Sequence, residues 1–344
     1  MAVTIIDVAR EANVSPSTVS RVITDHPRIS VKTKKKVREV MERLQYYPNF
    51  QARNLAARST QTIGVVMANS ATLAFQNPFF PEVIRGICTK AHAGQLGIYL
   101  STGGTEEEIF QEVVAMVQGQ KVDGIILLYS RVDDKTLNYL REMNFPFTIV
   151  GRPYEYENQI DFVDNDNRKI AQDVVNYLVE LGHKNISFIG GDLKFVVSSD
   201  RLEGYQSALA NHELTYQNQY FIHDFAYEQE GKEAIRHLMT QENPPTALVA
   251  HDDSVAYEII RFLEELEIRV PEDVSIISFN NHALSEHVKP PLTSVDIHIF
   301  ELGIKATELL LDRIKQPERE AVHQFVDTTL IVRNSCRSLN PREK

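Results

Sequence analysis

Short apolar runs that alternate with amphipathic stretches, from Thr62 onward, constrain the fold of this 344-residue chain more than any other feature. This alternation is typical of parallel sheets whose strands are joined by crossover helices. We expect one series of strands at 63–67, 97–101, 124–129, 148–151 and 162–163, and a second at 186–190, 221–225, 247–251 and 274–279. The two series predict an α/β body made of two doubly wound parallel-sheet lobes with a cleft between them.

The segment before this body has the pattern of a small, all-α helix-turn-helix head. Thr4 and Ser15 are suitable N-caps for helices over 5–12 and 16–23, and a third helix is expected over 32–44. Ser17, Thr18 and Arg21 share the exposed side of the second helix. A short exposed helix with small polar residues and an arginine suits the major groove of DNA. A helical hairpin inside an ordinary enzyme is the alternative.

The charge distribution favours the DNA-binding interpretation. Residues 1–60 contain eleven Lys and Arg against five Asp and Glu, a balance of +6. Because the whole chain carries -11, the remaining residues carry -17. A basic head on an acidic body is expected where one end of a protein meets phosphates.

Two segments of the head resemble a known family. VTIIDVAREANVSPSTVSRV at 3–22 and YYPNFQARNLA at 46–56 closely resemble the head and hinge of the lactose-repressor family, also called the LacI/GalR family. The resemblance implies that the second helix reads an operator. It also implies that a hinge helix folds on DNA, pairs with its dimer mate and inserts a leucine into the minor groove. The expected contacts with double-stranded operator DNA are Thr4, Ser15, Pro16, Ser17, Thr18, Ser20, Arg21, Asn49, Ala52, Arg53 and Leu55.

Polar and aromatic residues follow the expected strands of the body, where ligands of doubly wound folds gather. Rings that stack on sugar faces, together with carboxylates, amides and arginines that bind hydroxyls, predict a small sugar effector. Core packing is the alternative for any one of the rings. The candidates are Ser70, Phe75, Phe79, Tyr129, Arg131, Asp166, Phe195, Arg201, Phe225, His251, Asp252 and Asn280.

The resemblance continues through the body to about residue 335 and implies a fold like that of periplasmic binding proteins. NPFFPEVIRGI, KVDGIILL, LGHKNISFIGG, DRLEGY and PPLTSV look like landmarks of the family. Arg201 and Phe225 match effector-contacting positions of the family, whereas His251 and Asn280 depart from the asparagine and aspartate of many relatives. NPFFPEVIRGI, LLYSR and ISFNNH look most like the branch of maltose-operon repressors of Gram-positive bacteria.

These observations predict a division of the chain into a head, a linker and a core. We expect a DNA-binding domain at 1–47, a hinge at 48–61 and an effector-binding core at 62–340. Within the core, one lobe is expected to cover 62–181 and 294–323, and the other 182–293 and 324–338. The expected assembly is a homodimer without a cofactor that releases operator DNA when maltose or another α-glucoside binds. A phosphocarrier-protein corepressor, as in the catabolite-control branch of the family, would reverse the sign of regulation, because a corepressor strengthens operator binding.

The sequence opposes the competing classes of function. It contains no GxGxxG, GxxxxGK[ST], GxSxG or HExxH motif, which argues against an α/β sugar-processing enzyme. The acidic run at 164–167 begins like a calcium loop, but Lys169 and Val175 replace the required glycine and glutamate. Cys88 and Cys336 have no metal-binding spacing. The absence of an export signal and of a membrane-length apolar segment predicts a cytoplasmic protein. A cytosolic sugar-binding protein is a further alternative, and a secreted sugar-binding protein of the same two-lobed fold is another, which the missing export signal and the basic head both oppose.

Overall fold

A computed structural model describes residues 3–47, 59–68, 71–223, 225 and 229–340 of the chain. It separates into two compact units, Met1–Thr60 and Gln61–Lys344. We call them the head and the body.

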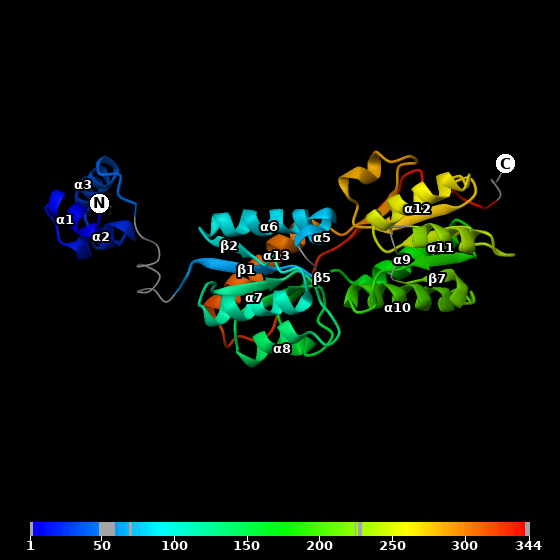
Figure 1. The fold of residues 1–344 in the computed structure, drawn as a ribbon, viewed down its shortest axis with the longest axis horizontal. Helices are drawn as coiled ribbons and strands as arrows, with labels where there is room; N and C mark the ends of the chain where they lie inside the picture. Colours follow the sequence, from blue (N-terminus) through cyan, green and yellow to red (C-terminus); the bar gives the residue numbers. More distant parts are fainter. Residues whose placement is uncertain (1–2, 48–58, 69–70, 224, 226–228, 341–344) are drawn as a thin grey trace. The chain divides into compact units, whose positions relative to one another are not determined.

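The head is a bundle of three helices (Figure 1). Its helices are α1 (Ile5–Glu11), α2 (Pro16–Ile23) and α3 (Val31–Arg43). Each has a hydroxyl residue at its N-cap, and Pro16 takes the first position of α2, where a missing N–H costs nothing. The small core is almost entirely aliphatic and consists of Val8, Ala9, Ala12, Val19, Val22, Val37 and Val40. The helix-turn-helix prediction is therefore confirmed.

The first lobe of the body is built on a six-stranded sheet with the order β11-β5-β4-β3-β1-β2. All of its pairings are parallel. The strands are β1 (Thr62–Val66), β2 (Gly97–Leu100), β3 (Gly124–Leu127), β4 (Phe147–Val150), β5 (Phe162–Asp164) and β11 (His323–Phe325). Its helices are α5 (Ala71–Gln76), α6 (Phe79–Ala93), α7 (Glu106–Gln118), α8 (Lys135–Glu142) and α13 (Ile299–Lys315), with the short helix η1 (Glu157–Gln159) before β5.

The second lobe repeats this design with the sheet order β12-β10-β9-β8-β6-β7, in which β12 alone is antiparallel. The strands are β6 (Ile186–Ile189), β7 (Phe221–Ile222), β8 (Ala247–Ala250), β9 (Ser275–Phe279), β10 (Thr293–Asp296) and β12 (Thr329–Ile331). The helices are α9 (Asn167–Glu180), α10 (Val196–Asn211), α11 (Gln229–Met239) and α12 (Asp253–Glu265), with the short helices η2 (Asn218–Tyr220) and η3 (Ala283–Glu286). The predicted two-lobed α/β fold is confirmed.

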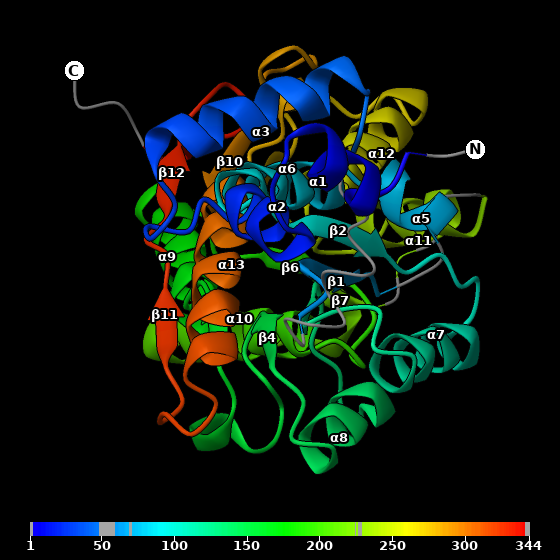
Figure 2. The same cartoon turned by 90° about the vertical axis from the view of Figure 1, so that its left-hand side faces the viewer.

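Glycines allow the helices of the first lobe to pack closely. A Cβ atom on Gly303 of α13 would lie 2.2 Å from the carbonyl oxygen of Val83 on α6. Reciprocally, a Cβ atom on Gly86 would lie 2.2 Å from the carbonyl oxygen of Phe300. The backbones of α6 and α13 therefore approach closely where the two helices pack on each other. Both helices belong to the first lobe (Figures 1 and 2).

The positions at which the chain crosses between the lobes differ from the predicted ones. The first crossing precedes α9, since α9 packs on α10 of the second lobe, instead of following residue 181. Strand β10 belongs to the second sheet and β11 to the first, so the later crossings follow residues 296 and 325. Asn165 joins the three crossing segments, because its side-chain amide donates to the carbonyl oxygens of Ile297 at 3.1 Å and Val326 at 2.9 Å.

The helices of the described residues include none with the length and apolar character needed to cross a lipid bilayer.

Candidate functional site

The exposed face of α2 is organised by Ser15. Its hydroxyl caps the helix by accepting from the backbone N–H of Thr18 at 3.2 Å, and it contacts the hydroxyls of Ser17 at 2.8 Å and Thr18 at 2.9 Å. Val19 is buried on the opposite side of α2. At the start of α1, Thr4 donates from its backbone N–H and its hydroxyl to Asp7, which lowers the pKa of that carboxyl. The start of α2 therefore presents closely spaced hydroxyl groups on a rigid helix.

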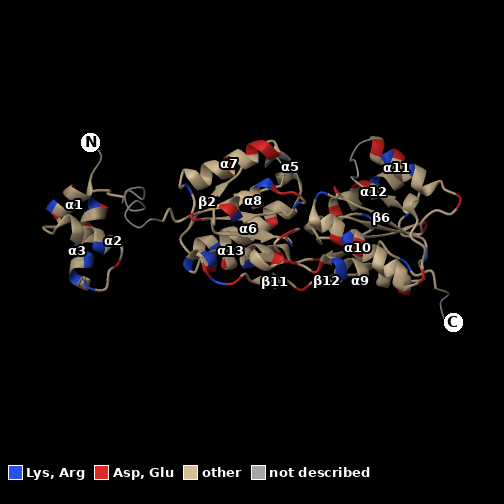
Figure 3. Cartoon of the chain, turned by 90° about the horizontal axis from the view of Figure 1, so that it is seen from below, with Lys and Arg blue, Asp and Glu red and all other residues tan. Residues whose placement is uncertain are grey.

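The cations of the head differ in how far they are already paired. Asp25 binds Lys34 at 3.0 Å and Arg38 at 2.7 Å, so two of the basic residues of α3 are partly neutralised. Arg21 on α2 is exposed and forms no ion pair with the residues that the structure describes. The positions of Lys and Arg along the ribbon of α2 and α3 are blue in Figure 3. The guanidinium of Arg21 is therefore available to bind an external anion or the edge of a nucleobase.

The remaining predicted DNA contacts belong to the hinge. Asn49, Ala52, Arg53 and Leu55 lie outside the residues that the structure describes.

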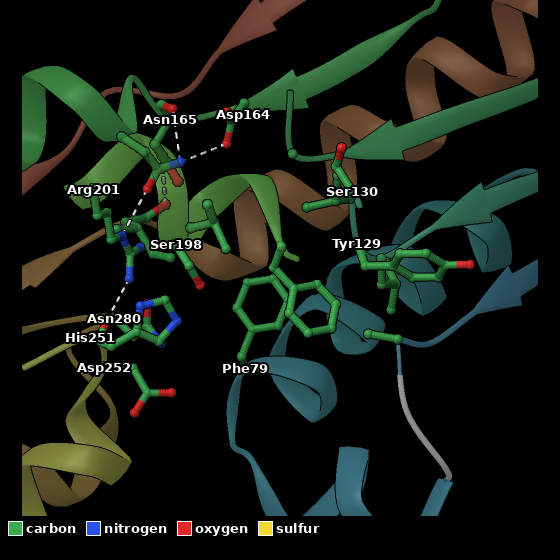
Figure 4. A pocket seen from close by; sticks show the side chains of 18 of the residues that line it. Phe79, Tyr129, Ser130, Asp164, Asn165, Ser198, Arg201, His251, Asp252 and Asn280 are labelled. Carbon is green, nitrogen blue, oxygen red and sulfur yellow. Dashed lines mark hydrogen bonds between the residues drawn. The ribbon is translucent and has the colours of Figure 1, made fainter. Parts of the chain in front are cut away.

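A cavity of about 280 Å³ lies between the two lobes of the body, at the carboxyl ends of their strands (Figure 4). Parallel strands of a doubly wound sheet place their carboxyl ends at one edge, which is where such folds bind ligands. The first lobe contributes aromatic side chains, including Phe79 and Tyr129, and the second contributes Phe195 and most of the polar groups. We call this hollow the first cavity.

Arg201 of α10 is the centre of the polar side of the first cavity. The Arg201 side chain is buried. Its Nε donates to Asn167 at 3.0 Å, and its Nη1 donates to the carbonyl oxygen of His251. Its guanidinium also lies 4.3 Å from the ring centroid of Phe279. Asn167 in turn donates to Asp164 at 3.0 Å, so a chain of hydrogen bonds runs along this wall (Figure 4).

Three buried polar atoms of the cavity wall have no hydrogen-bond partner among the described residues. They are Oγ of Ser130, Oγ of Ser198 and Nδ1 of His251. A buried polar group without a partner costs on the order of 1–3 kcal/mol. Polar groups at the cavity wall that lack protein partners are well suited to bind a ligand that supplies the missing hydrogen bonds.

The protonation of the wall is shifted by its burial. Burial raises the pKa of the Asp164 carboxyl to about 7 and lowers the pKa of Arg201 to about 10. Burial, followed by the neighbouring charge of Arg201, holds the pKa of His251 well below its usual value. Near neutral pH the wall therefore offers a neutral imidazole, a partly protonated carboxyl group and a fixed cation.

The structure brings most of the predicted effector-binding residues together. Seven of them line the first cavity, namely Phe79, Tyr129, Phe195, Arg201, His251, Asp252 and Asn280. Ser70 lies outside the described residues.

Four of the other predicted residues do not line the first cavity. Phe75 lines a neighbouring cavity, and Phe225 packs in the core of the second lobe against Phe262. Strand β7 ends at Ile222 instead of continuing to Phe225 as predicted. Asp166 is exposed and caps α9, since its side chain accepts from the backbone N–H of Lys169 at 3.0 Å.

The fourth of these residues is Arg131, which supports the aromatic wall without lining the first cavity. Its guanidinium lies 4.7 Å from the ring centroid of Phe195 and 5.2 Å from that of Tyr129. It is held there by Glu106 at 3.1 Å and by the carbonyl oxygen of Ala68. Arg131 therefore fixes the two rings by cation–π contacts.

Sequence reasoning missed several polar residues of the cavity. Asp164, Asn165 and Asn167 surround the predicted Asp166 and line the cavity in its place. Asn77 and Ser198 also line it. The run of acidic and amide residues at 164–167 directly after a strand was the available signal, but only the local turn determines which of its side chains face the cavity.

Comparisons with known proteins agree with this arrangement. The model of the family "Bacterial regulatory proteins, lacI family" matches residues 4–49, and that of the "Periplasmic binding protein-like domain" matches residues 175–336. The chain is 38% identical to the HTH-type transcriptional regulator MalR of Streptococcus pneumoniae serotype 4 over 319 residues, which cover 91% of the chain and 93% of that relative. The predicted resemblance to maltose-operon regulators is thus confirmed.

Solved structures give the same result. A protein of Bacillus cereus subsp. cytotoxis described as a LacI transcriptional regulator is 46% identical, with a TM-score of 0.79 over 81% of this chain and 99% of that one. The complex of the transcriptional regulator CelR with cellobiose is 31% identical, with a TM-score of 0.75 over 97% of this chain and 99% of that one. The chain belongs to the lacI family of bacterial regulatory proteins.

Proposed function

We propose that this regulator is a homodimeric repressor of sugar-utilisation genes that binds a roughly palindromic operator and releases it when maltose or a related α-glucoside fills the first cavity. The observation that carries the proposal is the polar and aromatic wall between the lobes, with its three unpartnered buried atoms. The related MalR and the cellobiose complex of CelR support a sugar effector.

Operator recognition is assigned to the exposed face of α2 and to the hinge. Ser15, Ser17, Ser20 and Arg21 are exposed on or next to this short helix, whose opposite side is buried in the core of the head. This is the placement that a recognition helix needs in a major groove. Thr4, Pro16 and Thr18 complete the proposed contacts of the head, while Asn49, Ala52, Arg53 and Leu55 are proposed contacts of the hinge.

The charges of the first cavity support an uncharged ligand. Among the lining residues that the structure describes, Arg201 is the only Lys or Arg, and it stands against Asp164, Asp192 and Asp252. Two of the donors of Arg201 are already used by Asn167 and His251. A phosphorylated sugar would meet these carboxylates with few free donors, whereas the hydroxyls of a neutral sugar both donate to and accept from such a wall.

Regulation follows from the position of the cavity between the lobes. A sugar that contacts both lobes favours the arrangement of lobes in which those contacts are complete. If that arrangement separates the two hinges of the dimer, the sugar lowers operator affinity by its difference in affinity for the two states.

Two measurements test the proposal in separate parts. Operator affinity, measured by fluorescence anisotropy, is expected to fall with salt with a log–log slope of about -0.9 for each phosphate contact. Calorimetry with glucose, maltose and cellobiose, using Arg201→Ala as the control variant, tests the sensor. A flat salt dependence would remove the DNA model, and a lack of binding by every sugar would remove the sensor while leaving the DNA model in place.

A further inference from the structure

A second cavity of about 690 Å³ lies next to the first, also at the junction of the two lobes. Phe75 and Glu82 line it from the first lobe, His282 and Ala283 line it from the segment after β9, and Phe300 lines it from the start of α13. Asn280 belongs to the walls of both cavities, so the two hollows are neighbours at this residue.

The backbone of Asn280 has an unusual conformation. Its φ is +101° and that of Asn281 is +49°, so two consecutive residues take left-handed conformations. Each such residue costs on the order of 1–3 kcal/mol unless the surroundings enforce it. The backbone N–H of Asn280 donates to the carbonyl oxygen of Val295 at 2.8 Å, and no hydrogen bond joins its side-chain amide to a described residue.

His282 is a second polar side chain without a partner at this junction. It is 5% exposed, and neither ring nitrogen has a hydrogen-bond partner among the described residues. Its backbone is fixed because its N–H donates to the carboxylate of Asp253 at 2.6 Å. That carboxylate also accepts from the hydroxyls of Ser278, Ser285 and Ser294, so it is fully occupied. The wall of the second cavity therefore contains the amide of Asn280 and an imidazole that has no hydrogen-bond partner among the described residues.

The chemistry of the second cavity matches that of the first. Phe75 provides an exposed ring, and Phe300 provides a ring that the Arg85 guanidinium covers on one face, 4.0 Å from the ring centroid. The carboxylates come from Asp296, Glu301 and Glu82, of which Glu82 is paired with Arg85 at 2.6 Å. No Lys or Arg is among its lining residues in the described part of the chain. Rings, carboxylates and unpartnered amide and imidazole groups suit a neutral polyhydroxylated ligand and disfavour an anion.

We propose that the second cavity binds the further glycosyl units of an oligosaccharide whose first units occupy the first cavity, and that the Asn280 side chain binds a hydroxyl at the junction. This inference rests on the proposed sugar effector and specifies its length. Because residues of both lobes also line the second cavity, a longer sugar bridges the lobes at two places and binds more tightly than a shorter one.

The experiment measures the dissociation constants of maltose, maltotriose and maltotetraose for the full chain by calorimetry. Ala283→Trp fills the second cavity from an exposed position, and Leu284→Trp is the matched control, since Leu284 is exposed on the same short helix but does not line the cavity. We expect the wild type and Leu284→Trp to bind maltotriose about tenfold more tightly than maltose, and Ala283→Trp to lose this difference while maltose affinity stays within about twofold.

Two results would overturn the inference. Equal affinities for all three sugars in the wild type, or equal weakening of all three by Ala283→Trp, would show that the second cavity does not hold further units, while the sensor function would stand. If no sugar of any length binds, the proposed function fails and the length preference fails with it. Equal thermal unfolding midpoints of the two variants would show that a loss of binding does not come from misfolding.

Discussion

The side-chain amide of Asn77 donates to the carboxylate of Asp252 at 3.1 Å, and this hydrogen bond joins the first lobe to the second at the wall of the first cavity. Asn77 lies between α5 and α6, and Asp252 caps α12 by accepting from Val255 at 2.9 Å. One carboxylate therefore contacts the opposite lobe, begins a helix and lines the cavity.

The contact between Asn77 and Asp252 should contribute to sugar affinity. Hydrogen bonds to charged groups contribute about 1.5–3 kcal/mol. Asn77→Ala is therefore expected to raise the dissociation constant of the sugar by about tenfold or more, as measured by calorimetry. Gln76→Ala, at the exposed neighbouring position, serves as the control. An unchanged constant in Asn77→Ala would mean that this contact does not stabilise the sugar-bound arrangement.

Replacing Arg201 should abolish sensing while leaving the head intact. Arg201→Ala removes the donors to Asn167 and His251 and the only Lys or Arg among the described lining residues. We expect sugar affinity to fall by about tenfold to a hundredfold, because hydrogen bonds to charged groups contribute about 1.5–3 kcal/mol. Operator affinity in the absence of sugar is expected to stay within about threefold, as measured by anisotropy. Sugar-dependent release that persists in Arg201→Ala would place the effector elsewhere.

Asp164 should make the free energy of unfolding fall as the pH rises. Burial raises its pKa in the folded chain to about 7, above the value of about 3.9 expected in the unfolded chain. The folded state thus binds the proton more tightly. This contribution to stability is complete below about pH 4 and is lost as the pH rises through about 7. Unfolding midpoints in denaturant, measured from pH 5 to 8, should show a smaller decline in Asp164→Asn than in the wild type. Parallel pH profiles of the two proteins would contradict this role.

The crossing of α6 and α13 should not tolerate a side chain at Gly303. Gly303→Ala places a methyl group 2.2 Å from the Val83 carbonyl oxygen, so the helices must separate. Overpacking of this kind costs about 1–3 kcal/mol in the free energy of unfolding. Chemical denaturation of Gly303→Ala and of Asp312→Ala, an exposed position on the same helix, measures the difference. Equal stability of the two variants would refute close helix contact at this crossing.

The fold was largely predictable from the sequence because its elements are specified locally. Ser15 and Pro16 mark the start of α2, and apolar runs mark nine of the strands. The edge strands β11 and β12 were missed, since each has three residues and none of them is buried. Strand β10 was missed as well, because Thr293 and Ser294 are polar although they are buried.

The candidate site was less predictable, because it depends on the direction of individual side chains. All the predicted strand ends except that of β7 lie within two residues of the observed ones, yet at β5 the turn sends Asp164 and Asn167 into the cavity while Asp166 caps α9. Asn77 reaches Asp252 only because the lobes meet, and no local pattern encodes a contact between residues so distant in sequence. The aromatic prediction failed at Phe225 for a similar reason, since burial in the core and exposure to a ligand favour the same residue type.

The most direct test of the account is the effect of sugar on operator binding by the full-length chain. In a fluorescence anisotropy titration at fixed salt, maltose or maltotriose is expected to weaken binding to a palindromic operator from the regulated locus by at least tenfold, and Arg201→Ala is expected to abolish the response. An increase in operator affinity on sugar addition would reverse the proposed sign and identify the sugar as a corepressor. Operator affinity that is unchanged by every sugar, in a protein that binds the operator tightly, would contradict the claim that the cavity between the lobes controls DNA binding.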